Sequence, residues 1–233
     1  MSSRGVRRRA LMAWSGGKDS ALALAALRYD ASVEVVGVLT TVTTDFDRVS
    51  IHGPRVEILD AQARALDLPV FKARVRAGGD NVEYEKAWAV ALARAREALG
   101  SVQAIGYGDL FLTDIRAYRE RQCADLGVEA LFPIWGEPTA TLARRAVREG
   151  YAAYLTSVDT TQLDGSFAGR RFDAELLNAL PTAVDPCGEN GEFHTCVVAA
   201  PIYRTPLEVL PGQRVLREGR FLYADITLVH RLA

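Results

Sequence analysis

The chain has 233 residues, of which 49% are hydrophobic and 24% are charged, and its formal net charge at pH 7 is −1. This length and composition suit a globular protein with a substantial core, built as one large domain or two small ones. The balanced charge offers no field that would attract a polyanion, which argues against a nucleic-acid partner. No stretch approaches the ~20 apolar residues of a membrane-spanning helix, so we expect no membrane partner. Three scattered cysteines form neither a disulfide framework nor a CxxC zinc pattern, and we expect a cytoplasmic protein.

Strand and helix patterns alternate along the first half of the chain. We expect strands over residues 11–14, 33–39, 70–75 and 102–107, and helices directly after residue 20 and over residues 54–66, 81–99 and 113–126. Pro54 favours a helix start and Thr113 an N-cap, whereas Gly100 and Gly127 favour helix ends. Strands that alternate with helices of this length predict an α/β fold, with a parallel sheet wrapped by helices.

The pattern changes beyond residue 127. The expected elements there are a helix over residues 139–149 and strands over residues 152–158, 214–216 and 221–229. From Pro181 onward the chain is rich in proline and glycine and looks mainly β, with a turn at Glu218-Gly219. We therefore expect one domain over residues 1–127 and a smaller α+β domain over residues 128–233.

Residues 15–20 read Ser-Gly-Gly-Lys-Asp-Ser and lie between the first expected strand and a helix. We call them the SGGKDS loop. Free N–H groups and the dipole at a helix start favour an anion, and Gly16 and Gly17 let the backbone wrap closely around it. Lys18 adds a mobile point charge and Ser20 a hydroxyl group. The spacing differs from the GxxxxGK[ST] phosphate-binding loop, yet it predicts a phosphate cradle.

Other polar or flexible residues fall at the same edge of the expected sheet. Ligands of parallel sheets bind at the carboxyl ends of the strands, where Ser15, Thr40, Thr41 and Gly108 all fall. Asp109 follows directly, in a position to hold magnesium or a ribose. These segments predict one nucleotide site.

A plainer interpretation applies to residues 109–120, which follow one of these strands. On that interpretation they are a turn and an exposed helix, in which Arg116 and Glu120 form an i,i+4 ion pair. The sequence leaves both interpretations open.

A second polar stretch lies at residues 185–195, which read Asp-Pro-Cys-Gly-Glu-Asn-Gly-Glu-Phe-His-Thr. Glu189 and Glu192 stand three residues apart, beside glycines that allow close approach to a ligand. Two such carboxylates could bind a cation, orient ammonia or act as a general base. The alternative is an acidic turn that leads into a strand near Phe193.

Together, SGGKDS at residues 15–20 and Gly-Glu-Phe-His-Thr at residues 191–195 resemble the diphthine–ammonia ligase family. Its ATP-binding domain is also called DUF71, and it belongs to the PP-loop ATP pyrophosphatase superfamily. The resemblance covers nearly the whole chain, and His52-Gly53 and residues 109–120 and 164–173 also look like family segments. The variants at residues 109–114 and 185–187 and at His194 look more like bacterial members.

The resemblance implies an ATP-binding domain of the adenine nucleotide alpha hydrolase type over residues 1–127, with a substrate-binding domain over residues 128–233. It implies ATP and Mg²⁺, adenylation of a carboxylate and attack by ammonia, with release of an amide, AMP and pyrophosphate. The carboxylate stays open, since it could be diphthine on a protein or another such as a corrinoid precursor. A homodimer also stays open.

The candidate site residues divide into three groups. Those expected to bind the nucleotide are Ser15, Gly16, Gly17, Lys18, Asp19, Ser20, Thr40, Gly108 and Asp109. Those expected to take part in catalysis are Lys18, Asp19, Glu189, Glu192 and Thr195, and Asp19 is also the candidate magnesium ligand. Further family positions are His52, Arg116, Tyr118 and Arg119.

Two other functions compete with an amide ligase. A sulfur-transferring, tRNA-modifying PP-loop enzyme would need a reactive cysteine, and Cys187 is the candidate nearest the two glutamates. A nucleotide-sensing module without catalysis would explain the SGGKDS loop but not the second polar stretch.

Overall fold

The computed structural model describes residues 7–45, 48–49 and 53–229. Within them a six-stranded sheet forms the first part of the molecule. Its strands are β1 (Arg8–Ala13), β2 (Val33–Thr43), β3 (Arg48–Val49), β4 (Val70–Val75), β5 (Ala104–Gly106) and β6 (Glu129–Leu131). Parallel pairing joins β4 to β2, β2 to β1, β1 to β5 and β5 to β6, while the short β3 pairs antiparallel with β2. The expected α/β fold with a largely parallel sheet is confirmed.

Helices cover both faces of this sheet. They are α1 (Lys18–Tyr29), α2 (Val56–Leu66), α3 (Asn81–Leu99) and α4 (Thr113–Asp125). Successive side chains of a strand point to opposite faces. Met12 accordingly packs in the core beneath α1 and α2, whereas Leu11 packs with Trp88 and Leu92 of α3 on the other face. Stretches of strand that are buried on both faces are mostly apolar, which is why the apolar runs within these strands could be recognised in the sequence.

The second part of the molecule is a four-stranded antiparallel sheet in the order β8-β7-β10-β9. Its strands are β7 (Ala152–Asp159), β8 (Phe193–Ala199), β9 (Val209–Arg217) and β10 (Phe221–Leu228), and its short helices are α5 (Thr139–Arg148), η1 (Gly165–Phe167) and α6 (Ala174–Ala179). This confirms the smaller α+β part. The boundary at residue 127 stays a prediction, and β6, which follows it, still pairs with β5.

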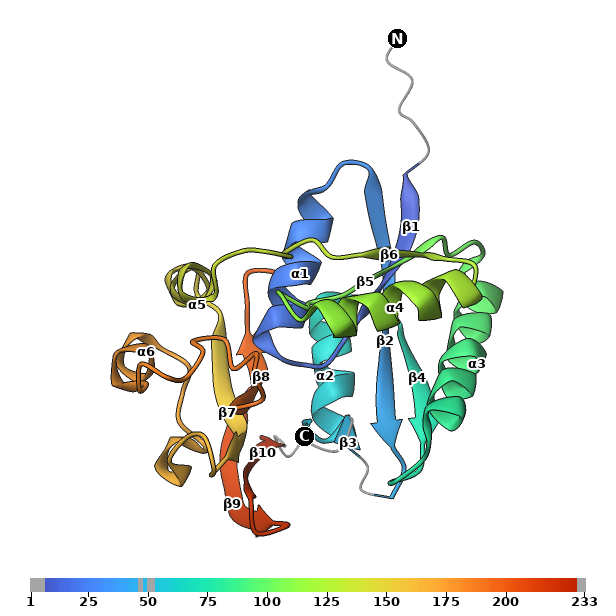
Figure 1. Ribbon diagram of the computed structural model, residues 1–233. Coiled ribbons are helices and arrows are strands. Elements are labelled where there is room, and N and C mark those ends of the chain that lie inside the picture. Colours follow the sequence, from blue (N-terminus) through green and yellow to red (C-terminus); the bar gives the residue numbers. More distant parts are fainter. Residues whose placement is uncertain (1–6, 46–47, 50–52, 230–233) are drawn as a thin grey trace.

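The two parts share one hydrophobic core. Figure 1 shows α1 and α2 between the parallel sheet and the orange and red strands of the second part. Leu22 and Leu24 of α1 lie in the same buried cluster as Leu155 of β7 and Phe193 of β8. Each fully buried leucine contributes about 1.5–3 kcal/mol to folding. The interface between the two parts is therefore held together by apolar packing.

Several local predictions differ from the structure. Thr113 is the first residue of α4 rather than its N-cap, which is Leu112, and no side chain caps that helix within the described chain. β1 begins at Arg8 and β2 continues to Thr43, because hydrogen bonds to neighbouring strands extend both beyond their apolar runs. Among the described helices, none combines the length and apolar character needed to cross a membrane.

Candidate functional site

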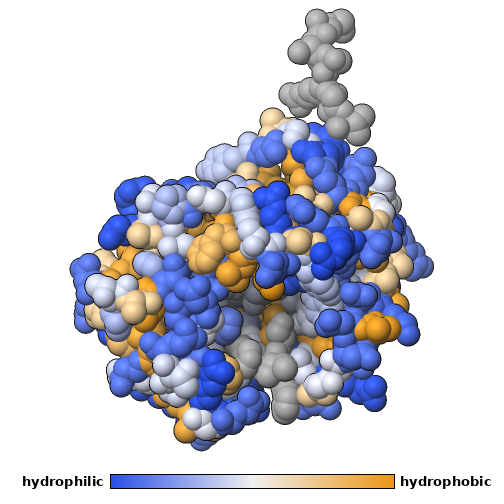
Figure 2. Space-filling model, viewed as in Figure 1, coloured by the Kyte–Doolittle hydropathy of each residue, from blue (hydrophilic) through white to orange (hydrophobic). Residues whose placement is uncertain are grey.

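Two adjoining cavities, of about 240 and 380 Å³, lie where the parallel strands end. Figure 2 shows this face of the molecule hollowed near its middle. The residues common to both linings are Ser15, Asp19, Val49, Asp109 and Glu189. A ligand in one cavity would therefore contact groups that also face the other.

The first cavity brings together residues that lie far apart in the sequence. Ser15, Thr40, Thr41 and Gly108 all line it, as expected from the ends of parallel strands. Its walls also include the aromatic side chains of Trp14, Tyr84, Trp88 and Tyr107. The Thr40 hydroxyl oxygen is buried and finds no hydrogen-bond partner among the described residues. Aromatic walls with an unused hydroxyl group suit a nucleoside, whose base is flat and whose edges are polar.

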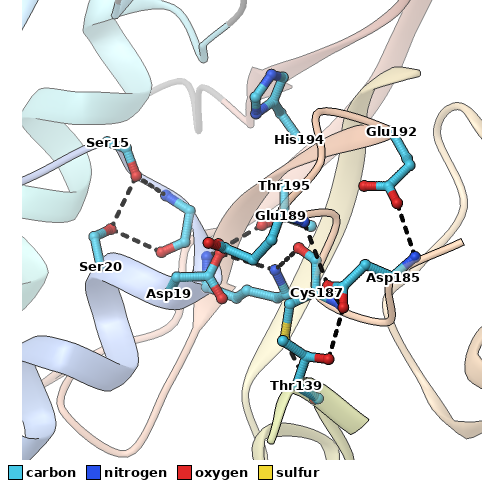
Figure 3. Close-up of polar contacts among 12 residues, drawn as sticks. Ser15, Asp19, Ser20, Thr139, Asp185, Cys187, Glu189, Glu192, His194 and Thr195 are labelled. Carbon is cyan, nitrogen blue, oxygen red and sulfur yellow. Dashed lines mark hydrogen bonds and ion pairs between the residues drawn. The ribbon is translucent and has the colours of Figure 1, made fainter. Parts of the chain in front are cut away.

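The SGGKDS loop has the backbone that its glycines allow. Gly16 has a φ of +81°, a conformation that other residues rarely adopt. The Gly17 N–H donates to Ser15 Oγ at 3.3 Å, and Ser20 Oγ lies 3.2 Å from Ser15 Oγ and donates to the Gly17 carbonyl at 2.8 Å (Figure 3). The loop thus gathers two hydroxyl groups and the start of α1 beside the cavities.

Gly108 allows the loop after β5 to approach the start of α1. A Cβ atom at this position would lie 2.8 Å from the Asp19 carbonyl carbon and 2.9 Å from the Ser20 nitrogen. Both are backbone atoms that cannot move aside. Only glycine therefore fits here without shifting the SGGKDS loop.

Lys18 is not the mobile charge that the sequence predicts, since its side chain is only 1% exposed. Its ammonium group donates to Asp19 Oδ2 at 2.8 Å and to the Cys187 carbonyl, and lies over the rings of Phe172 and Phe193. Burial is the largest single effect and disfavours this ammonium, but the charge and hydrogen bond of Asp19, together with the nearby Cys187 and Glu189, outweigh burial and raise the pKa of Lys18. Lys18 thus ties the loop to the second part while it stays charged.

Three carboxyl groups face the junction of the two cavities. Burial raises the pKa values of Asp19 and Asp109, and burial together with the charge of Asp19 raises the pKa of Glu189 to about 7 (Figure 3). Carboxylates held close together in a cleft disfavour one another's ionisation and attract cations. The junction is therefore acidic, and Glu189 can gain or lose a proton near neutral pH.

These carboxyl groups fit magnesium only in part. Within the described ranges no group of three or more His, Cys, Asp or Glu side chains could hold a metal by itself. Asp19 Oδ1, however, is buried and has no hydrogen-bond partner in the described chain. Because Mg²⁺ usually takes one or two protein carboxylates together with phosphates and waters, Asp19 with a bound nucleotide would suffice.

Glu192 lies behind the cavities rather than in their linings, as far as the structure describes them. We call residues 185–192 the acidic loop. One oxygen of the Glu192 carboxylate accepts a hydrogen bond from the Asp185 N–H at 2.8 Å (Figure 3). The same oxygen also accepts from the Asn190 side-chain amide at 3.1 Å, and the other oxygen accepts from the Asn190 N–H at 2.9 Å. The sequence predicted a place in the catalytic cleft. The structure instead uses this carboxylate to hold the loop that carries Glu189.

Two further residues attach the acidic loop and β8 to their surroundings. Asp185 accepts hydrogen bonds from the Thr139 hydroxyl at 2.6 Å and the Cys187 N–H at 2.8 Å. Thr195, which lines the second cavity as expected, accepts from the Lys18 N–H at 3.1 Å. The two motifs that the sequence singled out are therefore in direct contact.

Cys187 is a buried residue of the acidic loop, and its thiol donates to the Thr139 carbonyl at 3.4 Å. Burial raises its pKa to about 12. At neutral pH the group is a protonated thiol and not a nucleophilic thiolate.

The remaining family positions differ in location. Arg119 lines the first cavity, lies over the rings of Trp88 and Tyr107, and donates to the Tyr84 hydroxyl at 2.9 Å. Arg116 forms the expected i,i+4 pair with Glu120 at 2.8 Å, and Tyr118 contacts Glu85. Neither Arg116 nor Tyr118 is among the described residues that line the cavities. His52 lies outside the described residues.

The sequence did not indicate Gln62 of α2, which is fully buried directly behind the SGGKDS loop. Its side chain contacts Trp14, Gly16 and Val197. The only sequence signal is a polar residue within the buried face of an amphipathic helix, and that signal does not say what the residue contacts.

Comparison with known proteins agrees with this arrangement. Residues 8–130 match the family described as the diphthamide synthase N-terminal domain, and residues 139–228 match the diphthamide synthase C-terminal domain. The chain is also similar to a diphthine–ammonia ligase of Schizosaccharomyces pombe, with 26% identity over 225 residues. This alignment covers 88% of the chain but 36% of the yeast protein, so the chain spans about a third of the length of that relative.

Proposed function

Because the chain belongs to the diphthamide synthase family, we propose that it is an ATP-dependent, AMP-forming amide ligase that joins a carboxylate to ammonia. The similarity to the yeast diphthine–ammonia ligase supports this proposal. The observation that carries it is the contact between the SGGKDS loop and the acidic loop around two adjoining cavities. One cavity would take the nucleotide and the other the carboxylate and ammonia.

The nucleotide would occupy the first cavity. The aromatic walls and the unused Thr40 hydroxyl suit the nucleoside, while Ser15, Ser20 and the N–H groups at the start of α1 suit the phosphates. Asp19 and Asp109 would hold magnesium, which neutralises phosphate charge when bound. ATP supplies the adenylyl group that makes a carboxylate reactive toward ammonia.

The second cavity would take the carboxylate substrate and ammonia. Glu189 lies where the cavities meet and ionises near neutral pH, so it can accept the proton that an ammonium ion must lose before it attacks. Thr195, which lines this cavity, would contact the substrate. Glu192 and Lys18 would act by holding the two loops in position rather than by touching the reacting atoms.

The nature of the carboxylate is part of the proposal. Leu112 and Ile115 line the second cavity and are 36% and 40% exposed, so the cavity has an apolar rim that is open to solvent. Such a rim suits a substrate that is larger than the cavity, whether a protein-borne carboxylate or a bulky small molecule. A homodimer and the division at residue 127 stay predictions. The free thiols of the three cysteines fit the proposed cytoplasmic location.

Sulfur transfer is less well supported, because Cys187 is a buried, protonated thiol. Cys187→Ser separates the two activities. An amide ligase should keep most of its turnover, since a serine hydroxyl can also donate to the Thr139 carbonyl. A sulfur transferase should lose its turnover completely.

Product analysis tests the proposal directly. The protein is incubated with ATP, Mg²⁺, ammonium chloride and a panel of carboxylates that includes diphthine-bearing elongation factor and corrinoid precursors. We expect AMP and pyrophosphate in equal amounts, dependent on both ammonium and a carboxylate. Release of ADP, or ATP binding without turnover on any carboxylate, would contradict it, and the latter would favour a nucleotide-sensing module.

A further inference from the structure

A buried hydrogen-bond network, formed by Gln62 with Trp14, Gly16 and Val197, lies behind the SGGKDS loop. We infer that Gln62 is a positioning residue, which aims the Gly17 N–H at the phosphate side of the loop by holding the Gly16 carbonyl on the opposite side. This inference deepens the proposed function and rests on it, because it concerns how the loop binds the phosphates of ATP.

The orientation of the Gln62 amide follows from its neighbours. The indole N–H of Trp14 can only donate, and it lies 2.9 Å from Gln62 Oε1. The amide nitrogen therefore faces the other way, where it donates to the Gly16 carbonyl at 3.0 Å and to the Val197 carbonyl at 2.8 Å. Both amide hydrogens and the amide oxygen are thus satisfied, and the side chain has one stable orientation.

The Gly16 carbonyl is held by two donors from different parts of the fold. Besides Gln62 of α2, the Val197 N–H of β8 donates to it at 2.9 Å. In a trans peptide the carbonyl and the following N–H point in opposite directions, and the described chain contains no cis peptide. The Gly17 N–H must then point toward the cavities. It does so, since it donates to Ser15 Oγ, and Ser15 lines both cavities.

A peptide between two glycines needs such an external hold. Glycine adopts positive and negative φ values with similar ease, so the Gly16-Gly17 peptide has little orientation preference of its own. The fit around it is also tight, because a Cβ atom on Gly16 would lie 2.9 Å from Gln62 Oε1. Without Gln62, only the Val197 N–H among the described residues would hold the Gly16 carbonyl, and the peptide could rotate more readily and turn this carbonyl oxygen toward the phosphate. That rotation would replace an attraction with a repulsion.

The experiment measures binding of three probes, each by titration calorimetry: ATP with Mg²⁺, pyrophosphate with Mg²⁺, and adenosine, which has no phosphate. Gln62→Met keeps the length of the side chain and removes its hydrogen bonds. We expect ATP and pyrophosphate to bind about tenfold more weakly, the effect of roughly one lost hydrogen bond to a phosphate, and adenosine to bind unchanged.

Gln122→Met is the matched control. Gln122 is also a buried glutamine of a helix, but neither its amide oxygen nor its amide nitrogen finds a hydrogen-bond partner in the described chain. All three probes should bind to this variant as to the wild type. Gln62→Glu serves as a second variant in case Gln62→Met does not fold, since it keeps the acceptor for Trp14 but places a second oxygen against the two carbonyls. Gln62→Glu should also bind ATP and pyrophosphate more weakly and adenosine as the wild type does.

If Gln62 only stabilised the fold, its substitution would weaken the binding of all three probes equally. That result would overturn the inference. Unchanged pyrophosphate binding in a folded Gln62 variant would also overturn it. A wild-type protein that binds neither ATP nor pyrophosphate would instead contradict the proposed function, so the two failures are distinguishable.

Discussion

The backbone N–H of Lys18 donates a hydrogen bond to the hydroxyl oxygen of Thr195 at 3.1 Å, across 177 residues of sequence. Lys18 opens the helix that follows the SGGKDS loop, and Thr195 lies in β8 of the antiparallel sheet. One of the N–H groups that a helix start leaves without a helical partner is therefore satisfied by the second part of the molecule.

Thr195→Val tests this connection. Valine keeps the shape but leaves the buried Lys18 N–H without its acceptor, which we expect to cost about 1–3 kcal/mol of folding free energy. For a chain of this size, each kcal/mol lowers the melting temperature by about 2–4 °C. Thermal unfolding checks this, with Thr195→Ser as the control that keeps the hydroxyl. Equal melting temperatures for the two variants would contradict the prediction.

Turnover should depend on the ionisation of Glu189. Its pKa is raised to about 7 by burial and the charge of Asp19, so the carboxylate that accepts a proton forms only as the pH rises through that value. We expect the rate of pyrophosphate release to rise with pH around a midpoint near 7. Glu189→Gln should lower kcat by about 10²–10⁴ and remove this limb of the profile. A variant that retains the wild-type profile would exclude Glu189 as the base.

The same carboxyl group should make folding stability depend on pH. Glu189 has a reference pKa of 4.5 and a folded-state pKa of about 7, so between these values the folded state holds a proton that the unfolded state has released. Stability from this group is complete below about pH 4.5 and is lost as the pH rises through 7. Urea unfolding across this range should show a shallower decline for Glu189→Gln than for the wild type. If the free energy of unfolding fell equally with pH in both proteins, other titrating groups would determine its pH dependence.

Glu192→Gln should impair turnover without removing the nucleotide site. An amide has one acceptor oxygen, so the substituted side chain would turn an N–H toward one of the two backbone N–H groups whose hydrogen bonds Glu192 now accepts. We expect a lower kcat and a lower melting temperature, while ATP binding stays within about twofold because the first cavity is unchanged. Glu175→Gln is the control, since that side chain is 90% exposed. A loss of ATP binding equal to the loss of turnover would place Glu192 in the nucleotide site.

Gly108→Ala should displace the start of α1. The added methyl group would press on the backbone of Asp19 and Ser20, and overpacking of this kind costs about 1–3 kcal/mol. We expect weaker ATP binding and a lower melting temperature. At Gly79 the closest contact of an added methyl is the flexible end of Glu83, so Gly79→Ala should change neither quantity. Equal ATP binding and equal melting temperatures in the two variants would show that the close contact of Gly108 with the start of α1 is not needed.

Structural features could be predicted from the sequence where they depend on residues that are close together in the chain. The SGGKDS loop is a local pattern of glycines before a helix, and the expected bounds of α3, residues 81–99, agree with the structure because Gly100 ends a long periodic helix. Four strands of the first sheet, β1, β2, β4 and β5, could also be found from their apolar runs, whereas the short β3 and β6 were not predicted.

Features that depended on distant residues could not be derived in this way. Gln62 is defined by contacts with Trp14, Gly16 and Val197, none of which adjoins it in sequence. Glu189 and Glu192 looked equivalent in the sequence, yet one faces the cavities and the other faces the backbone of its own loop. Which way each side chain turns is decided by the packing of the acidic loop against Thr139 and Lys18, and no spacing rule encodes it.

The placement of α1 and α2 between two sheets has a consequence for protein engineering. Leu22 and Leu24 pack in one cluster with Leu155 and Phe193, so the surface of α1 is shaped to fit one particular antiparallel sheet. Grafting the second part of a relative onto this chain, in order to change its substrate, would leave mismatched apolar surfaces beneath the SGGKDS loop. A working chimera would have to take α1 and α2 from the relative together with the new sheet.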